Sequence, residues 1–95
     1  MGIYFEWDPA KAAANYRKHG ISFDEAVSVF RDDRSITVYD PDHSSMAEDR
    51  FITIGASVWD RVLVVVHCDR GEGIRLISAR QATPREREQY HAKSL

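Results

Sequence analysis

The sequence has one cysteine, Cys68, among 95 residues. A single cysteine excludes an internal disulfide framework, which fits a protein kept in a reducing compartment. Long apolar runs are also missing, and none approaches the roughly 20 residues that a membrane-spanning helix requires. The amino-terminal segment carries an acid at Glu6 and lacks the apolar core of a signal peptide. These absences predict a cytoplasmic protein that has no membrane partner.

A strong positive charge is absent as well, which argues against a general nucleic-acid binder. The 13 Lys and Arg residues face 15 Asp and Glu residues, for a formal net charge of −2. The charges are unevenly distributed, because residues 1–60 hold six basic and eleven acidic residues whereas residues 61–95 hold seven and four. Two interpretations of the positive last third stay open: local contacts with phosphate groups, or a solvated mixed surface.

Hydrophobic residues make up 43% of the chain and aromatic residues 11%, which is enough for one compact core. Because chains of this length rarely divide, residues 1–95 are expected to form a single domain. Charged residues of both signs reach 29%, a fraction that is typical of a folded protein and not of a disordered one.

The beginning of the chain predicts a strand and a helix. Alternating apolar side chains across residues 3–7 are typical of a short strand. Asp8 followed by Pro9 is typical of a helix start, and Gly20 is typical of the end of that helix. Trp7 shares a face of the strand with other apolar residues, so we expect it to pack in the core rather than to stack on nucleic-acid bases.

A second helix is predicted to begin at Ser22, which has capping-box spacing to Glu25. A polar segment at residues 31–33 should end it. The apolar residues between these limits have helical spacing and form one stripe, made of Phe23, Ala26, Val27 and Phe30. Two short helices cannot bury such stripes alone, so another layer must cover them.

That layer is predicted to be a sheet. Segments rich in β-branched and aromatic residues indicate four strands, at residues 35–40, 50–55, 61–68 and 74–80. Residues 41–49 form a polar loop, while residues 56–60 and 69–73 suit antiparallel hairpins. A last helix should begin with a capping box at Thr83 and end near Lys93. The expected fold is α+β in the order β-α-α-β-β-β-β-α, with two amino-terminal helices and a carboxy-terminal helix packed on a mostly antiparallel sheet.

The segment at residues 61–68 is expected to be the central strand, because its five consecutive apolar residues suit a strand covered on both faces. The first two helices can cover one face of the sheet, and the last helix can cover only part of the other. We therefore expect some apolar surface to be reserved for a partner, as large exposed apolar patches usually are.

Several segments taken together resemble the BrnT family of toxins. They are FEWDPAK, NYRKHGISFDEAVSVF, EDRFITIG, RVLVVV and IRLISARQATPREREQY, and they span the chain from Phe5 to Tyr90. No single segment is decisive, but their order and spacing as a set are specific.

The resemblance implies a RelE/ParE-like fold and the toxin half of a type II toxin–antitoxin system. It also implies an endoribonuclease that cleaves cellular RNA without a metal ion or other cofactor and thereby inhibits growth. The implied partner is a BrnA-like antitoxin with a ribbon-helix-helix DNA-binding domain. The complex of the two would repress its own promoter, so promoter DNA would be bound only through the antitoxin complex.

Metal-free RNA cleavage requires a base for the 2′-OH proton, cations for the developing phosphorane charge and an acid for the leaving oxygen. Arg50, Arg75 and Arg80 are the candidate cations, because each lies in or beside a predicted strand and an arginine fork can hold two phosphate oxygens. An ideal strand would direct Arg75 and Arg80 to opposite faces. Either a bulge intervenes, or one of the two is structural and pairs with a helix acid such as Glu86 or Glu88.

His67 is the candidate base, since Asp69 two residues later could orient its ring. The competing interpretation is a histidine that is hydrogen bonded at the edge of the core. Lys11 and Tyr90 are the candidate substrate-binding residues, with a solvated helix face and lid packing as their respective alternatives. His19 is better explained as a residue that caps its helix.

No metal site is predicted, because His43, His67, Cys68 and His91 lack the spacing of metal ligands. The main alternative function is a non-catalytic binding module that holds an antitoxin or DNA-binding partner and modulates transcription. Residues 10–30 contain two helices but no basic recognition helix, so direct DNA binding is disfavoured.

Overall fold

The computed structural model describes residues 3–46 and 48–93. The elements in chain order are β1 (Tyr4–Glu6), α1 (Pro9–His19), α2 (Phe23–Ser28), the 3₁₀ turn η1 (Val29–Arg31), β2 (Ile36–Asp40), β3 (Arg50–Ala56), β4 (Val62–Arg70), β5 (Gly73–Gln81) and α3 (Pro84–Lys93). The predicted α+β class is confirmed, since the described residues form three helices and a five-stranded mixed sheet. No helix within the described ranges is long and apolar enough to cross a membrane.

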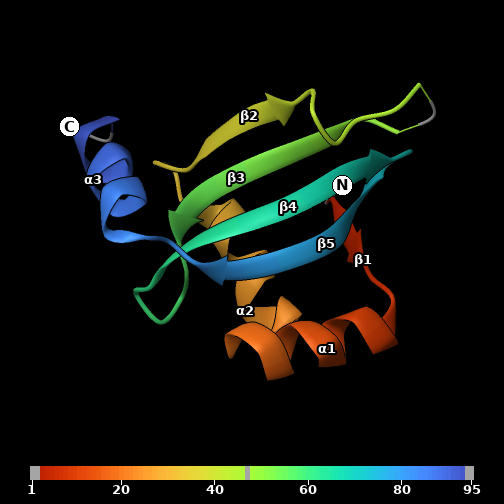
Figure 1. Ribbon diagram of the computed structural model, residues 1–95, viewed down its shortest axis with the longest axis horizontal. Helices are drawn as coiled ribbons and strands as arrows, with labels where there is room; N and C mark the ends of the chain where they lie inside the picture. Colours follow the sequence, from red (N-terminus) through yellow and green to blue (C-terminus); the bar gives the residue numbers. More distant parts are fainter. Residues whose placement is uncertain (1–2, 47, 94–95) are drawn as a thin grey trace.

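The five strands form one sheet in the order β1-β5-β4-β3-β2 (Figure 1). Strands β2 to β5 are antiparallel neighbours, whereas β1 runs parallel to β5. Strand β4 is therefore central, as its apolar run predicted, but the expectation that both of its faces are covered is wrong, because the helices that pack on the sheet lie on one face. Five of its residues, Leu63, Val64, Val65, His67 and Cys68, are almost completely buried.

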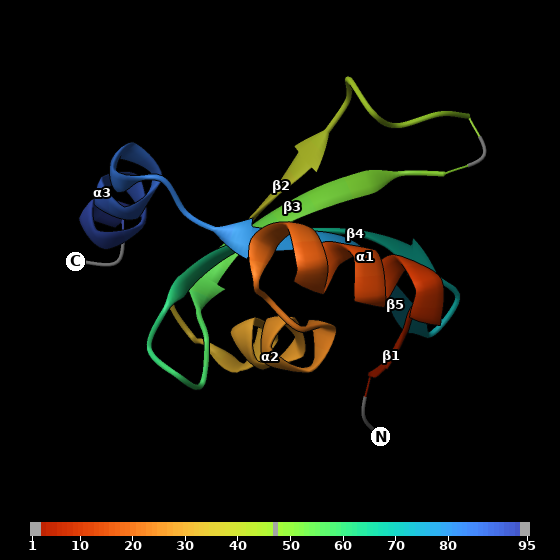
Figure 2. The ribbon, with the colours of Figure 1, turned by 60° about the horizontal axis from the view of Figure 1, so that its bottom comes forward.

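Helices α1 and α2 cover one face of the sheet (Figure 2). The core lies between the two layers and consists of Ile21, Phe23, Ala26 and Val29 on the helical side and Leu63, Val65, Leu76 and Ala79 on the sheet. Trp7 packs edge-on against Phe23 at the margin of this core, with ring centroids 5.7 Å apart. The predicted core role of Trp7 is thus confirmed.

The ends of α1 follow the sequence signals closely. Asp8 accepts a hydrogen bond from the N–H of Ala10 at 2.8 Å, and Gly20 ends the helix with a φ of 71°, which is left-handed. The second helix begins as expected, since Ser22 Oγ accepts a hydrogen bond from the N–H of Glu25 at 3.1 Å. It is shorter than expected, because α-helical geometry ends at Ser28 and the last turn is a 3₁₀ turn.

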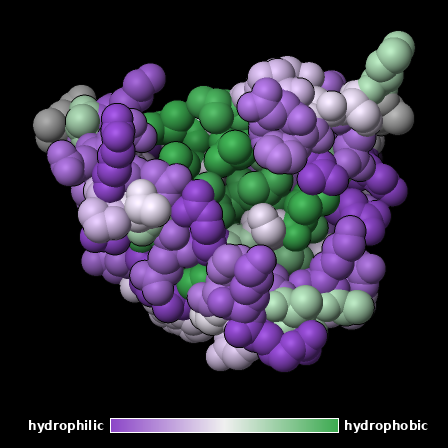
Figure 3. Space-filling view, viewed as in Figure 1, coloured by the Kyte–Doolittle hydropathy of each residue, from purple (hydrophilic) through white to green (hydrophobic). Residues whose placement is uncertain are grey.

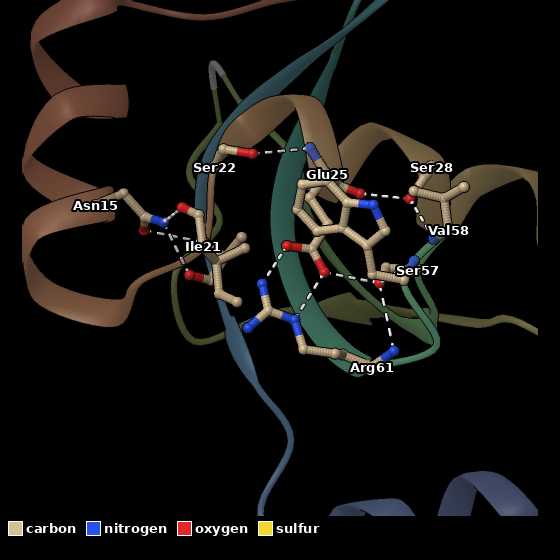
Figure 4. Close-up of polar contacts among 10 residues, drawn as sticks. Asn15, Ile21, Ser22, Glu25, Ser28, Ser57, Val58 and Arg61 are labelled. Atoms are coloured by element: carbon tan, nitrogen blue, oxygen red, sulfur yellow. Dashed lines mark hydrogen bonds and ion pairs between the residues drawn. The ribbon is translucent and has the colours of Figure 1, made fainter.

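Glu25 does not complete the predicted capping box. Its buried carboxylate accepts hydrogen bonds from the Arg61 guanidinium and, at 2.7 Å, from Ser57 Oγ (Figure 4). Burial raises the pKa of the Glu25 carboxyl, but the hydrogen bonds from Arg61 and Ser57 outweigh burial and hold the pKa below its ordinary value. The N–H of Val58 also donates to Ser28 Oγ at 2.9 Å. These contacts fix the loop between β3 and β4 to α2.

Helix α1 covers the part of the β5 edge that β1 leaves unpaired. Strand β1 pairs with only the first three residues of β5, and α1 lies beside the rest. The Asn15 side chain donates to the carbonyls of Ala79 and Ile21 at 2.9 and 3.0 Å, and accepts from the N–H of Ala79 at 3.0 Å. The amide therefore supplies at Ala79 the hydrogen bonds that a neighbouring strand would supply.

Helix α3 lies at the end of the sheet and not across its second face (Figures 1 and 2). The expectation that it covers part of that face is therefore wrong. The physical reason is that polar contacts hold it beside the strand ends: Tyr90 donates to Asp32 Oδ2 at 2.5 Å, and Arg80 binds Glu86. Its start is the predicted capping box, in which Thr83 and Glu86 exchange hydrogen bonds of 2.8 and 3.2 Å.

Candidate active site on the open face of the sheet

The open face is the face of the sheet opposite α1 and α2. The strand register arranges its side chains in three rows that run across the strands. The first row holds Ile36, Ile54, Val64 and Arg80, the second holds Val38, Ile52, Val66 and Ser78, and the third holds Asp40, Arg50, Cys68, Arg75 and Glu6. Figure 3 looks onto this face and shows a hydrophobic patch bordered by hydrophilic residues.

A β-bulge in β5 brings Arg75 and Arg80 to the open face. The pairing with β4 passes over Ile77, so β5 carries one residue more than its partner. The extra residue shifts the alternation of side chains by one position, and both arginines reach the face that already carries Arg50. The first of the two alternatives left open by the sequence, an intervening bulge, is therefore present.

The three arginines share a face but do not form one cluster. Arg50 and Arg75 flank Cys68 in the same row, so two strand spacings, roughly 10 Å, separate their backbones. Arg80 pairs with Val64, four residues along β4 from Cys68, which is a separation of roughly 13 Å. The structure thus brings Arg50 and Arg75 to the same end of the sheet and leaves Arg80 at the opposite end.

The acid partners of these arginines differ in how firmly they are held. Arg80 makes a two-pronged ion pair with Glu86 at 2.8 and 2.9 Å, which lowers the pKa of Glu86 to about 2. Arg50 makes one longer hydrogen bond, at 3.3 Å, from its Nε to Glu48. Among the described residues, the only acid in contact with Arg75 is Glu6, at 3.8 Å. The sequence also left open that one of the two arginines is structural and pairs with a helix acid. Arg80 makes such a pair with Glu86.

A hollow of about 280 Å³ opens beside Arg50 at the corner of the open face. It is lined by Asp40, His43, Arg50, Ile52, Val66, Ile77 and Ser78. His43 Nδ1 lies 2.8 Å from Asp40 Oδ2, and Ser44 Oγ bridges the carbonyl of Asp40 and the N–H of Arg50 at 2.6 and 2.8 Å. A histidine, a carboxylate and a guanidinium thus meet at one solvent-open hollow.

A second hollow, of about 230 Å³, lies on the other side of the bulge, between α1 and β5. It is lined by Lys11, Ala14, Asn15, Lys18, His19, Ile77 and Ser78. The two hollows share Ile77 and Ser78. The candidate substrate-binding residue Lys11 therefore lies across the bulge from Arg50, and basic side chains border both sides of it.

His67 lies in the core, on the helix-covered face of the sheet. Its Nε2 is 2.8 Å from Thr53 Oγ1, and its ring lies between Phe30 and Phe51, with centroids at 4.9 and 6.0 Å. Burial lowers the pKa of His67. The hydrogen-bonding partner is thus Thr53 and not Asp69, and the position in the core puts His67 beyond the reach of a substrate on the open face.

Tyr90 is buried beside a third hollow, of about 510 Å³, between α3 and the β3–β4 loop. This hollow is lined by Arg34, Ala56, Asp60, Arg61, Val62, Gln81, Arg87, Tyr90 and His91. Its polar groups largely serve the fold, since Tyr90 binds Asp32, Arg61 binds Glu25, and Arg87 donates to a backbone carbonyl at 3.2 Å. Within the described residues, no group of three or more His, Cys, Asp or Glu side chains could hold a metal ion.

The pairing of His43 with Asp40 was missed by the sequence analysis, which considered His43 only as a metal ligand. A usable signal was present, because Asp40 ends a predicted strand and His43 follows three residues later in a polar loop. That spacing is common to many turns, so the sequence could not distinguish an oriented histidine from a solvated one.

Residues 7–86 match a family described as "Ribonuclease toxin, BrnT, of type II toxin-antitoxin system". Among solved structures, the fold is similar to the 1.1 Å crystal structure of the Brucella abortus ribonuclease toxin BrnT, with a TM-score of 0.59 and 23% sequence identity. The match covers 86% of this chain and 99% of that one. No curated protein matches the chain.

Proposed function

Since this chain belongs to the BrnT family of ribonuclease toxins of type II toxin–antitoxin systems, we propose that it cleaves RNA on the open face of its sheet. The observation that carries the proposal is the bulge at Ile77, which places Arg75 and Arg80 on the face that already carries Arg50. Guanidinium groups around an apolar patch suit a single RNA strand, because they bind its phosphates while its bases contact the patch.

Arg50 and Arg75 take the phosphate at the reacting bond and stabilise the charge that develops on it. Their place in one row on either side of Cys68 supports this role, as do the long contacts to their acid partners, which a phosphate group can replace. Arg80 binds the RNA backbone further along the strand while it remains paired with Glu86.

Lys11 extends the phosphate-binding surface across the bulge, since its hollow adjoins that of Arg50. Tyr90 supports this surface indirectly, because its hydroxyl is engaged with Asp32 and positions α3. His67 receives no part in the reaction, because the core surrounds it.

Cleavage proceeds without a metal ion or other cofactor. The chemistry of the open face supports this statement, since arginines can stabilise the phosphorane charge and the ribose 2′-OH supplies the nucleophile. We place this activity in the cytoplasm, where cellular RNA is accessible.

A BrnA-like antitoxin with a ribbon-helix-helix domain neutralises the toxin by covering the open face. Half-buried and exposed apolar side chains across this face support a protein partner, and Val38, with 50% of its surface exposed, lies near its edge. A helix laid across the patch or a strand added at the edge of β2 would bury it, with acidic side chains opposite the arginines. The resulting complex represses its own promoter through the antitoxin.

The order of elements also supports kinship with RelE/ParE toxins, because two helices precede four antiparallel strands and a further helix follows them. Superposition on solved members of that group tests this kinship directly.

The activity is tested with purified protein and an end-labelled RNA, in buffer with and without a chelator. We expect the same fragments at the same rate in both buffers, together with growth arrest on expression that the neighbouring antitoxin gene relieves. Binding of the antitoxin without any RNA cleavage would replace the proposal with the alternative of a non-catalytic binding module.

A further inference from the structure

The corner hollow contains an oriented histidine. His43 Nδ1 lies 2.8 Å from Asp40 Oδ2, and a carboxylate can only accept hydrogen bonds, so the ring proton is on Nδ1. The Asp40 side chain is 12% exposed and that of His43 is 69% exposed. In the neutral ring Nε2 is therefore the nitrogen without a proton, as in a histidine–carboxylate pair that acts as a base, and the His43 side chain lines the corner hollow.

The backbone around this pair is held in place by the strand ends. Asp40 is the last residue of β2 and pairs with Arg50, the first residue of β3. Ser44 Oγ donates to the carbonyl of Asp40 and accepts from the N–H of Arg50, which ties the loop carrying His43 to both strands. The position of the histidine relative to Arg50 is thus set by the sheet.

We propose that His43 is the general base of the RNA cleavage and that Asp40 is its positioning residue. This inference rests on the proposed ribonuclease function and deepens it. His43 lines the same hollow as Arg50, so a phosphate held by Arg50 has its ribose within reach of His43. His43 thereby supplies the proton acceptor that the arginines of the open face cannot provide.

The cleavage step moves one proton to His43 and exchanges one bond at phosphorus for another. His43 Nε2 takes the proton of the ribose 2′-OH, and the 2′-oxygen forms a bond to phosphorus while the bond from phosphorus to the 5′-oxygen breaks. The 5′-oxygen leaves with the bonding electrons and takes a proton from solvent water. The protonated His43 then returns its proton to the solvent. The products are a 2′,3′-cyclic phosphate and a 5′-hydroxyl, and Arg50 stabilises the intermediate charge.

Kinetics on a short RNA distinguish a general base at His43 from a residue that only stabilises the turn. His43→Ala is expected to lower kcat about 100- to 10,000-fold with KM and the urea midpoint unchanged, and added imidazole should restore part of the rate. His43→Gln can still donate to Asp40 but cannot accept the proton, so it should be as slow as His43→Ala. Asp40→Asn should lower kcat at least about tenfold without a change in KM.

His91→Gln is the matched control, since His91 is an exposed histidine on α3 away from the corner hollow, and it should cleave normally. Wild-type cleavage together with an active His43→Gln variant, or no rescue by imidazole, overturns the proposal and leaves the ribonuclease function standing. Absence of cleavage by the wild-type protein overturns both.

Discussion

Arg75 and Arg80 lie on the same face of the sheet, although an odd number of steps separates them along β5. The extra residue Ile77 causes this arrangement, because the pairing with β4 passes over it. The two arginines nevertheless differ in their surroundings. Arg80 is bound by both oxygens of Glu86, whereas Arg75 has one contact of 3.8 Å with Glu6. Arg75 is therefore the more readily available to a phosphate group, and Arg80 contributes more to the fold.

The ion pair between Arg80 and Glu86 predicts a pH-dependent contribution to stability. Glu86→Gln should lower the free energy of unfolding by about 1 kcal/mol at neutral pH, since the pair is partly exposed but two-pronged. The folded pKa of Glu86 is about 2, below the ordinary value of 4.5. The contribution is therefore complete above pH 4.5 and is lost as the pH falls from 4.5 through about 2.

Urea unfolding at several pH values measures this difference. Glu88→Gln is the matched control, because Glu88 lies exposed on the same helix, and its unfolding free energy should follow that of the wild type. Equal destabilisation by both substitutions would show that the effect is one of helix charge and not of the ion pair.

The sequence predicted the elements well because their signals are local. Asp8, Gly20 and Thr83 mark helix ends through hydrogen bonds and backbone angles that involve only near neighbours. The apolar run of β4 likewise marks its central place. The bulge at Ile77 was only one of two alternatives, because it depends on how β5 aligns with β4, which a single strand does not encode.

The site was less predictable, since it depends on contacts between distant segments. His67 has the spacing of an oriented base with Asp69, yet the helix-covered face buries it between Phe30 and Phe51. Glu25 has the spacing of a capping box, yet Arg61 draws its carboxylate to a loop far along the chain. In both cases tertiary packing decides between two roles that the local pattern leaves open.

Burial of His67 predicts a loss of stability in mild acid. Its pKa is lowered by burial relative to the ordinary 6.5, so below that pH the unfolded chain binds a proton that the folded protein does not. The free energy of unfolding should therefore fall as the pH drops below 6.5, by at most about 1.4 kcal/mol per pH unit.

His67→Gln keeps a hydrogen-bonding side chain next to Thr53. It should remove the part of the pH dependence of the unfolding free energy that His67 contributes, and urea midpoints at matched pH values would reveal the change. The corresponding exposed substitution, His91→Gln, should keep the wild-type slope. An unchanged slope in His67→Gln would mean that folding does not lower the pKa of His67.

The amide of Asn15 is predicted to be important for the edge of β5. Asn15→Ala leaves the N–H and carbonyl of Ala79 without these partners in a buried place, which should lower the free energy of unfolding by about 3 kcal/mol. Gln89→Ala removes an exposed amide from a helix and should change stability little. A small effect of Asn15→Ala in thermal or urea unfolding would mean that water replaces the amide at this edge.

Coverage of the open face by the antitoxin is tested by placing a charge on the apolar patch. Val38→Glu should weaken the complex with the antitoxin encoded beside the gene at least about tenfold, as measured by titration calorimetry. Val58→Glu is the control, because Val58 is even more exposed, at 71%, but lies on the β3–β4 loop outside the open face. The reverse order of effects would place the antitoxin on the loop and not on the sheet.

The proposed function places RNA cleavage at the arginines of the open face. Its most direct test is the rate of cleavage of one labelled RNA, in chelator, by Arg50→Ala and by Arg85→Ala. The two variants lose the same charge, but Arg50 lines the corner hollow whereas Arg85 is exposed on α3. We expect Arg50→Ala to cleave about 100-fold more slowly than the wild type, with its fold intact, and Arg85→Ala to cleave at the wild-type rate. Equal rates for Arg50→Ala and the wild type would contradict the assignment of cleavage to this face.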